Sequence, residues 1–119
     1  MADTYTVIIE ENGRVLADKI EIAETLASRS QGLLGRQSLD PGQGLLIRPC
    51  SSIHMFFMKF PIDAIFLSKD LKVVRIAHSL MPWRLSGCMF GCYQVLEMCS
   101  GVAKNCSLSK GNTLKLIKN

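Results

Sequence analysis

Turn-forming residues divide this chain into short apolar segments, each about the length of one β-strand. In the first segment, Tyr5 to Ile9, the side chains alternate between two faces as they do in a half-buried strand. Asn12-Gly13 follows, and this dipeptide tolerates the positive φ that both central positions of a tight hairpin turn require. We therefore expect residues 14–17 to run back against the first strand and residues 19–22 to extend the pairing.

Later segments repeat this pattern of short strands. Ile53–Met58 and Ile62–Leu67 are apolar on both faces and are predicted to be the central strands. Residues 80–92 contain prolines and glycines without a sustained period, which predicts a long loop over the core or over a site. The remaining predicted strands are Leu45–Ile47, Val73–Ala77, Tyr93–Cys99 and Thr113–Ile117.

One stretch has helical spacing. Thr25 can cap a helix that carries Leu26, Arg29 and Leu33, and Gly35 can end it. Many short strands with one early helix predict a mainly β fold, an antiparallel β-sandwich or squat barrel with the short helix packed at one end. The strand order stays open. With 119 residues, 48% of them hydrophobic, the chain is predicted to form a single domain over residues 1–119.

Charge and the amino-terminal sequence bear on partners and compartment. The chain has 14 basic and 10 acidic residues, and a net charge of +4 is too small to indicate nucleic acid or a membrane, so we expect neither partner. The first residues lack the basic start and apolar run of a secretory signal, and no apolar segment approaches the ~20 residues that span a bilayer. These observations predict a cytoplasmic protein.

The chain has an odd number of cysteines, which favours free thiols over a disulfide framework when no secretory signal is present. A zinc site of four thiolates is arithmetically conceivable, but the short two-residue spacing typical of such sites is absent. We therefore predict no metal and no cofactor. The five are Cys50, Cys88, Cys92, Cys99 and Cys106.

Polar residues within the apolar stretch 53–67 are the first candidates for a site. Asp63 shares its strand face with Ile65 and Leu67, so it is either an anchor that accepts backbone amides or a site acid. His54 and Met58 fall on one face of the predicted strand. His54 is then either a satisfied core residue or a contact for a ligand.

Charged and aromatic residues elsewhere give further candidates. Arg29 and Arg36 lie two helical turns apart and can clamp an anion, although Arg29 can instead pair with Asp63 or Glu97 and fix the helix to the sheet. Glu97 is a second acid within an apolar strand, either a site group or a residue on the solvated face of an edge strand. Trp83 is either a stacking platform or folded back over the core. Motifs of nucleotide and serine hydrolases are absent from the sequence.

Several blocks of sequence, taken in order, resemble one family. They are SRSQGLLGR (28–36), GQGLLI (42–47), IHMFFMKFPIDAIFL (53–67), VLE (95–97) and Gly111. From Ala23 to Leu116 the chain is similar to the family called domain of unknown function 192, small proteins found widely in prokaryotes. The resemblance implies a mainly β fold with one helix and no agreed activity. The chain departs from the family pattern at Leu34, Ala64, Asn112, Cys88 and Cys92.

Three functions remain open. The first is a domain that binds a small ligand, such as an anion, in a pocket near Arg29, His54 and Asp63. The second is a structural or protein-interaction module without a ligand. The third is a small enzyme in which Asp63 or Glu97 acts with His54 in acid and base chemistry, and the sequence does not decide whether any reaction is catalysed. The expected binding residues are Arg29, Arg36, His54, Met58, Asp63, Trp83 and Glu97, and the expected apolar walls of the pocket are Phe56, Met58, Trp83 and Tyr93.

Overall fold

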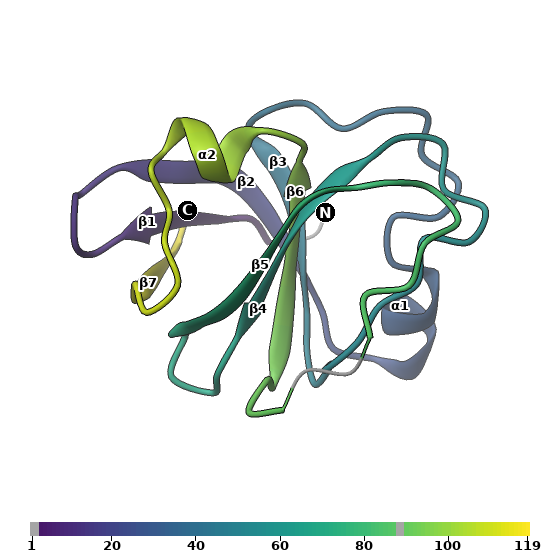
Figure 1. Cartoon of the computed structure of the whole chain (residues 1–119). Helices are drawn as coiled ribbons and strands as arrows, with labels where there is room; N and C mark the ends of the chain where they lie inside the picture. The colour runs from purple at the N-terminus through teal and green to yellow at the C-terminus, as the bar shows by residue number, and fades with distance from the viewer. Residues whose placement is uncertain (1–2, 88–89) are drawn as a thin grey trace.

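The computed structural model describes residues 3–87 and 90–119, in which seven strands form one sheet that curls into a half-barrel (Figure 1). The strand order is β5-β4-β6-β3-β2-β1-β7. The fold is mainly β, as the sequence predicts. The strands are β1 (Tyr5–Ile9), β2 (Val15–Ala23), β3 (Gln43–Ile47), β4 (Ile62–Leu67), β5 (Val73–Leu80), β6 (Gln94–Cys99) and β7 (Leu114–Lys118), and the helices are α1 (Leu26–Gln31) and α2 (Val102–Asn105).

All neighbouring strands pair antiparallel except β2 and β3, which are parallel. A parallel pair needs a crossover connection, and the segment that contains α1 supplies it. The two edges of the sheet approach each other at one end, where Lys72 and Thr113 form an isolated bridge and the Leu114 amide donates to the Leu71 carbonyl oxygen (2.9 Å). These bonds hold the curled sheet as a half-barrel.

The sheet buries residues on both faces, because β3, β4, β5 and β6 alternate their side chains between two separate hydrophobic clusters, whereas β1 and β7 contribute to one of them. One cluster lies inside the curl and includes Ile65 and Leu96. The other lies on the opposite face, under α1 and the loop before β4, and includes Phe66 and Val95. Figure 1 shows α2 at the end of the curled sheet and α1 with the long loops at the other end. No helix of the described residues is long and apolar enough to cross a membrane.

The prediction of a strand at Ile53–Met58 is wrong. The chain turns there: the Met58 amide donates to the Met55 carbonyl oxygen (3.2 Å), and Phe57 adopts a φ of 65°. Met55 and Met58 are buried while the two phenylalanines between them are exposed. The high apolar content of the segment therefore reflects loop packing and exposed aromatic rings, and it does not reflect a central strand.

Both helices differ from the prediction. α1 ends at Gln31 instead of Gly35, because Gly32 adopts a φ of 51° and closes the helix with its amide on the Ser28 carbonyl oxygen. α2 was not predicted, since its four residues are too few to show a period. The loop predicted over residues 80–92 begins one residue later, because β5 continues to Leu80. Residues 88–89 of this loop lie outside the described residues.

Candidate functional site

A cavity of about 280 Å³ lies between α1, the loop that follows β3, and the face of β6 that points away from the inside of the curl. Its volume lies just below the range seen for small-molecule sites, ~300–1,000 Å³. The crossover between β2 and β3 places α1 over this face of the sheet, so the cavity follows from the topology. The lining residues are Leu26, Arg29, Ser30, Gln31, Gly32, Leu33, Leu34, Ile47, Pro49, Cys50, Ser52, Ile53, His54, Met58 and Glu97.

Helix α1 forms one wall of the cavity and holds Arg29. Its amino terminus is fixed by a reciprocal cap, in which the Ser28 amide donates to Thr25 Oγ1 (3.0 Å) and the Thr25 amide donates to Ser28 Oγ (3.1 Å). No residue of α1 is fully buried, and Ser28 and Arg29 are half-buried, so the helix rests on the cavity without filling it. Arg29 Nη1 donates to the Pro49 carbonyl oxygen (3.2 Å), whereas the buried Arg29 Nε has no partner within the described residues.

Glu97 forms the floor of the cavity. It is 5% exposed, and no hydrogen-bond donor reaches its carboxylate from the part of the chain that the structure describes. Burial raises the pKa of Glu97 to about 7, and the positive charge of Arg36 acts in the opposite direction by lowering it. A Cβ built on Gly32 would lie 3.7 Å from Glu97 Oε1, so the end of α1 lies directly over the carboxyl group.

Cysteines lie beside this cavity. The Cys50 thiol donates to the Ser52 carbonyl oxygen (3.1 Å), and burial raises the pKa of Cys50. The Cys92 thiol donates to the carbonyl oxygens of Gln94 (3.2 Å) and Cys50 (3.4 Å). Residues 3–87 and 90–119 contain no group of three or more His, Cys, Asp or Glu side chains that can hold a metal ion. Cys88 lies outside the described residues.

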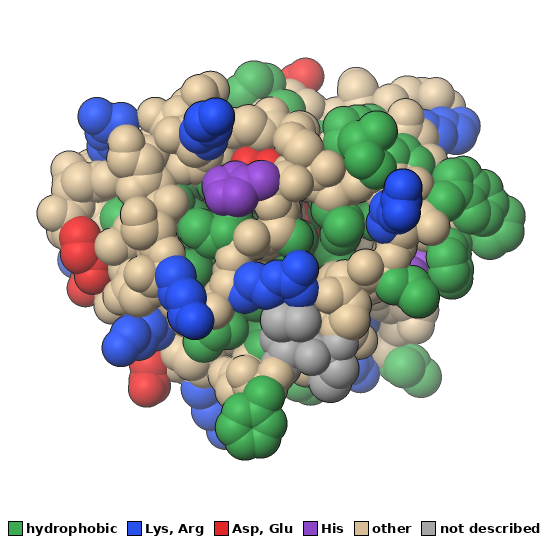
Figure 2. All heavy atoms as spheres, in the orientation of Figure 1, with side chains coloured by type: hydrophobic (Ala, Val, Ile, Leu, Met, Phe, Trp, Pro, Cys, Tyr) green, Lys and Arg blue, Asp and Glu red, His purple; other side chains and the backbone are tan. Residues whose placement is uncertain are grey.

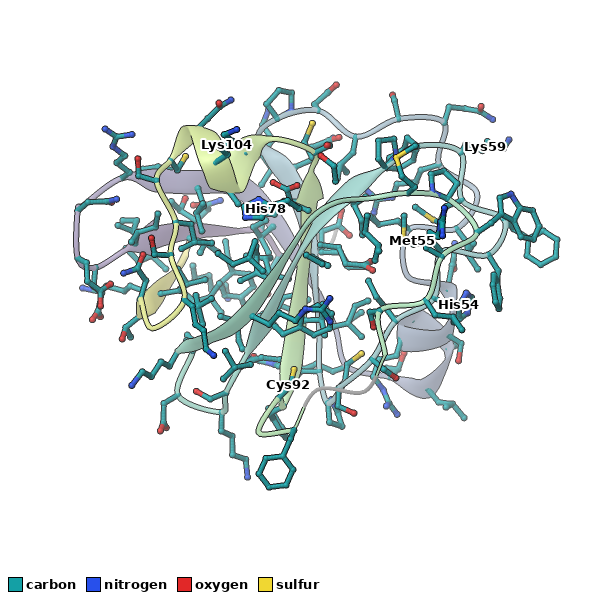
Figure 3. All side chains as sticks on the ribbon, viewed as in Figure 1. His54, Met55, Lys59, His78, Cys92 and Lys104 are labelled. Carbon is teal, nitrogen blue, oxygen red and sulfur yellow. The ribbon has the colours of Figure 1, made fainter. Side chains whose placement is uncertain are left out.

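Four of the predicted site residues meet at the cavity: Arg29, His54, Met58 and Glu97. His54 lies on the loop beside α1 (Figure 3), where its Nδ1 accepts a hydrogen bond from the Phe56 amide (3.3 Å) and its ring stacks on the Phe56 ring at 5.1 Å. Arg36 does not line the cavity, but it is close enough to Glu97 for its positive charge to lower the pKa of Glu97. Cys50 and Ser52 line the cavity and were not predicted. Their position shortly after the buried strand β3 is the sequence feature that could have indicated them.

The structure does not place Asp63 with Arg29 and His54. Ala64 is the residue paired with Glu97 across β4 and β6, so Asp63, its neighbour in the chain, points to the opposite face of the sheet. There its carboxylate accepts backbone amides from Ser79 (2.9 Å), Gly101 (3.1 Å) and Ala103 (3.0 Å). Asp63 thus anchors α2 to the sheet, which is the structural alternative considered for it.

Two further expectations also differ from the structure. Arg29 makes no ion pair with Asp63 or Glu97 in the described part of the chain, because its guanidinium reaches the Pro49 carbonyl instead. Trp83 is not folded over the core: it is 59% exposed, and its ring packs against Phe57 at 4.8 Å between ring centroids. The expected apolar walls Phe56, Trp83 and Tyr93 do not line the cavity.

Comparison with known proteins identifies the family. The family DUF192, described as uncharacterized ACR, matches residues 7–116. The chain belongs to the DUF192 family. A UPF0127 protein of Pyrococcus abyssi is 32% identical to it over 118 residues, which are 93% of this chain and 97% of the relative. A UPF0127 protein of Thermococcus sibiricus is 31% identical over 100 residues, 81% of this chain, and the chain spans 64% of that relative's length.

Solved structures share the DUF192 fold seen here. A crystal structure of a protein of unknown function from Novosphingobium aromaticivorans superposes with a TM-score of 0.80 at 25% identity, covering 93% of this chain and 82% of that one. A proposed transcription regulator from Sinorhizobium meliloti superposes with a TM-score of 0.79 at 24% identity, covering 98% and 94%. At 24% identity the second likeness shows the fold alone.

Proposed function

We propose that this DUF192 chain binds a small anionic ligand in the cavity beneath α1. The observation that carries this proposal is the side chain of Arg29, which lines the cavity and whose buried Nε has no partner within the described residues. A buried donor without a partner costs about 1–3 kcal/mol, and buried polar groups in folded proteins are nearly always paired. A carboxylate or phosphate oxygen of a ligand supplies the missing acceptor.

Glu97 and His54 give the ligand a second and a third contact. With a pKa of about 7, the Glu97 carboxyl group carries a proton in part of the molecules at neutral pH and can donate to a ligand oxygen or accept from a ligand hydroxyl. The Nδ1 of His54 accepts from the Phe56 amide, which leaves Nε2 of the neutral ring as the donor. A ligand with one anionic group and one hydroxyl group fits this arrangement.

Ligand-observed NMR with a panel of small carboxylates, hydroxy acids and phosphate monoesters tests the proposal. Arg29→Gln is expected to abolish the transfer signal of any compound that binds the parent protein. Arg48→Gln is the matched control, because Arg48 is also partly buried but pairs with Glu24 (3.2 Å) away from the cavity. Binding that survives Arg29→Gln, or a panel from which no compound binds, would contradict the proposal.

A further inference from the structure

An exposed group of aromatic rings stands on the loops that flank the cavity. This aromatic cluster consists of Phe56, Phe57 and Trp83, which are 37%, 70% and 59% exposed. Trp83 contacts both phenylalanine rings, at 6.1 Å from Phe56 and 4.8 Å from Phe57 between ring centroids. In the space-filling view, hydrophobic side chains project from one end of the molecule (Figure 2), the end where Met55 and Lys59 lie (Figure 3). Large apolar surfaces in contact with water are unusual and mark interaction sites.

The two loops that carry the cluster are held together by hydrogen bonds. The Met55 amide donates to the Arg84 carbonyl oxygen (2.8 Å), and the Trp83 amide donates to the Met55 carbonyl oxygen (2.7 Å). The Ile53 amide donates to Ser86 Oγ (2.9 Å), and the Ser86 amide returns a bond to the Ile53 carbonyl oxygen (3.0 Å). The rings are therefore presented by a fixed support.

The backbone at two members of the cluster is strained. Phe57 and Trp83 have φ values of 65° and 69°, in the left-handed region that bulky residues rarely adopt. Such conformations persist where the surrounding structure holds them, and they concentrate at functional sites. Both rings remain exposed, so this strain does not serve to bury them.

The surface around the aromatic cluster is positively charged. Residues 41–62 and 71–96, which contain both loops, have no Asp or Glu, whereas they contribute the exposed cations Lys59 and Arg84. In Figure 2, Lys and Arg side chains flank the projecting hydrophobic side chains, and no acidic side chain lies beside them on this face. The net charge of +4 for the whole chain does not reveal this segregation. The complementary surface is both apolar and anionic.

We propose that the aromatic cluster docks the protein on an anionic lipid surface. Phe57 and Trp83 enter the interfacial layer, where aromatic rings are favoured, and Lys59 and Arg84 face the lipid phosphates. A lipid surface fits better than a peptide, because peptide recognition uses a groove or an exposed strand edge. Here the rings project outward and pack against each other. The proposal is independent of the cavity ligand.

Vesicle binding with Trp83 as the reporter tests this docking. Trp83 is the single tryptophan of the chain, so its emission reports directly on the cluster. With vesicles of phosphatidylcholine and phosphatidylglycerol, we expect a blue shift of Trp83 emission and co-sedimentation of the protein. With phosphatidylcholine alone, we expect binding that is about tenfold weaker or more, because the positive rim then has no anionic surface to face.

Matched variants separate the contributions of the aromatic rings and of the positive charges to vesicle binding. Phe57→Ser, and separately Lys59→Gln with Arg84→Gln, are each expected to weaken sedimentation with the anionic vesicles about tenfold. Phe90→Ser is the control, because Phe90 is fully exposed but lies near Tyr93, whose amide bonds to Leu67 at the far end of β4. Circular dichroism establishes that each variant is folded.

Three outcomes would overturn the proposal. The first is a parent protein that does not sediment with the anionic vesicles. The second is a Phe57→Ser variant that binds as well as the Phe90→Ser control. The third is a dimer in solution that Phe57→Ser converts to a monomer without any vesicle binding by either form, since the cluster would then contact a second copy of the chain.

Discussion

Replacing Glu97 by Gln is expected to stabilise the protein at neutral and alkaline pH. The carboxyl group is buried without a hydrogen-bond donor from the described residues, and its pKa rises from 4.5 to about 7. At about 1.4 kcal/mol for each pKa unit, this difference of about 2.5 corresponds to about 3 kcal/mol. Glutamine has nearly the same shape and carries no charge, so it removes the cost of ionising this group.

The pH dependence follows from the two pKa values of Glu97. Below pH 4.5 the carboxyl group is protonated in both the folded and the unfolded chain, and it contributes no difference. Between pH 4.5 and about 7 the unfolded chain releases the proton while the folded protein keeps it. The free energy of unfolding of the parent therefore falls through this window relative to Glu97→Gln, and the difference stays constant above it.

Urea denaturation followed by far-ultraviolet circular dichroism, at several pH values from about 4 to about 8, measures this difference. We expect the parent and Glu97→Gln to be of similar stability at the acid end and the variant to be about 3 kcal/mol more stable at the alkaline end. Glu24→Gln is the control, because the Glu24 side chain is 62% exposed. A Glu97→Gln variant with the pH profile of the parent, or one less stable at pH 8, would refute this account of the buried carboxyl group.

Three other substitutions have expected effects on urea denaturation. Asp63→Asn should lower the free energy of unfolding by about 2 kcal/mol or more, since three backbone amides lose a charged acceptor, and parental stability would contradict the anchoring role. Gly44→Ala should lower the free energy of unfolding by about 1–3 kcal/mol, because the new Cβ would lie 2.6 Å from Ile20 Cδ1 and 2.7 Å from the Glu97 carbonyl oxygen. An unchanged urea midpoint would show that the strands can move apart to make room for the Cβ. Thr25→Ala should lower the free energy of unfolding by about 1 kcal/mol, because it removes the side chain that caps α1. Unchanged stability would mean that water replaces the capping hydrogen bond.

Local patterns in the sequence predicted most of the strands. Asn12-Gly13 and the alternation in β1 are local signals, and the structure has a hairpin there. Its turn is wider than the predicted one, because Gly13 has a positive φ and Asn12 does not. Residues 62–67 were predicted as a strand buried on both faces, and all six are buried. Residues 53–58 have the same apolar composition but form a loop, since a loop that packs over a core also needs buried methionines. Composition alone does not separate these two cases.

Long-range contacts explain what the sequence did not predict. α2 is held by the Asp63 carboxylate, which comes from a strand about 40 residues earlier, so no local pattern marks it. The parallel pairing of β2 and β3 is likewise a property of the whole sheet. His54 and Glu97 were predicted as site residues because they are polar groups among apolar ones, and Arg29 because it could clamp an anion together with Arg36. Whether Asp63 joins them depends on the register of β4 against β6, which brings Ala64 opposite Glu97.

The six-residue helix over the cavity has a consequence for motion. Because no residue of α1 is fully buried, little apolar contact resists its local unfolding, whereas the strands beneath it are buried on both faces. The amides of α1 should therefore exchange with solvent deuterium through a local opening, well before those of β4 and β6, which exchange only when the sheet itself unfolds. A ligand can be admitted beneath the helix during such an opening, while the half-barrel stays intact.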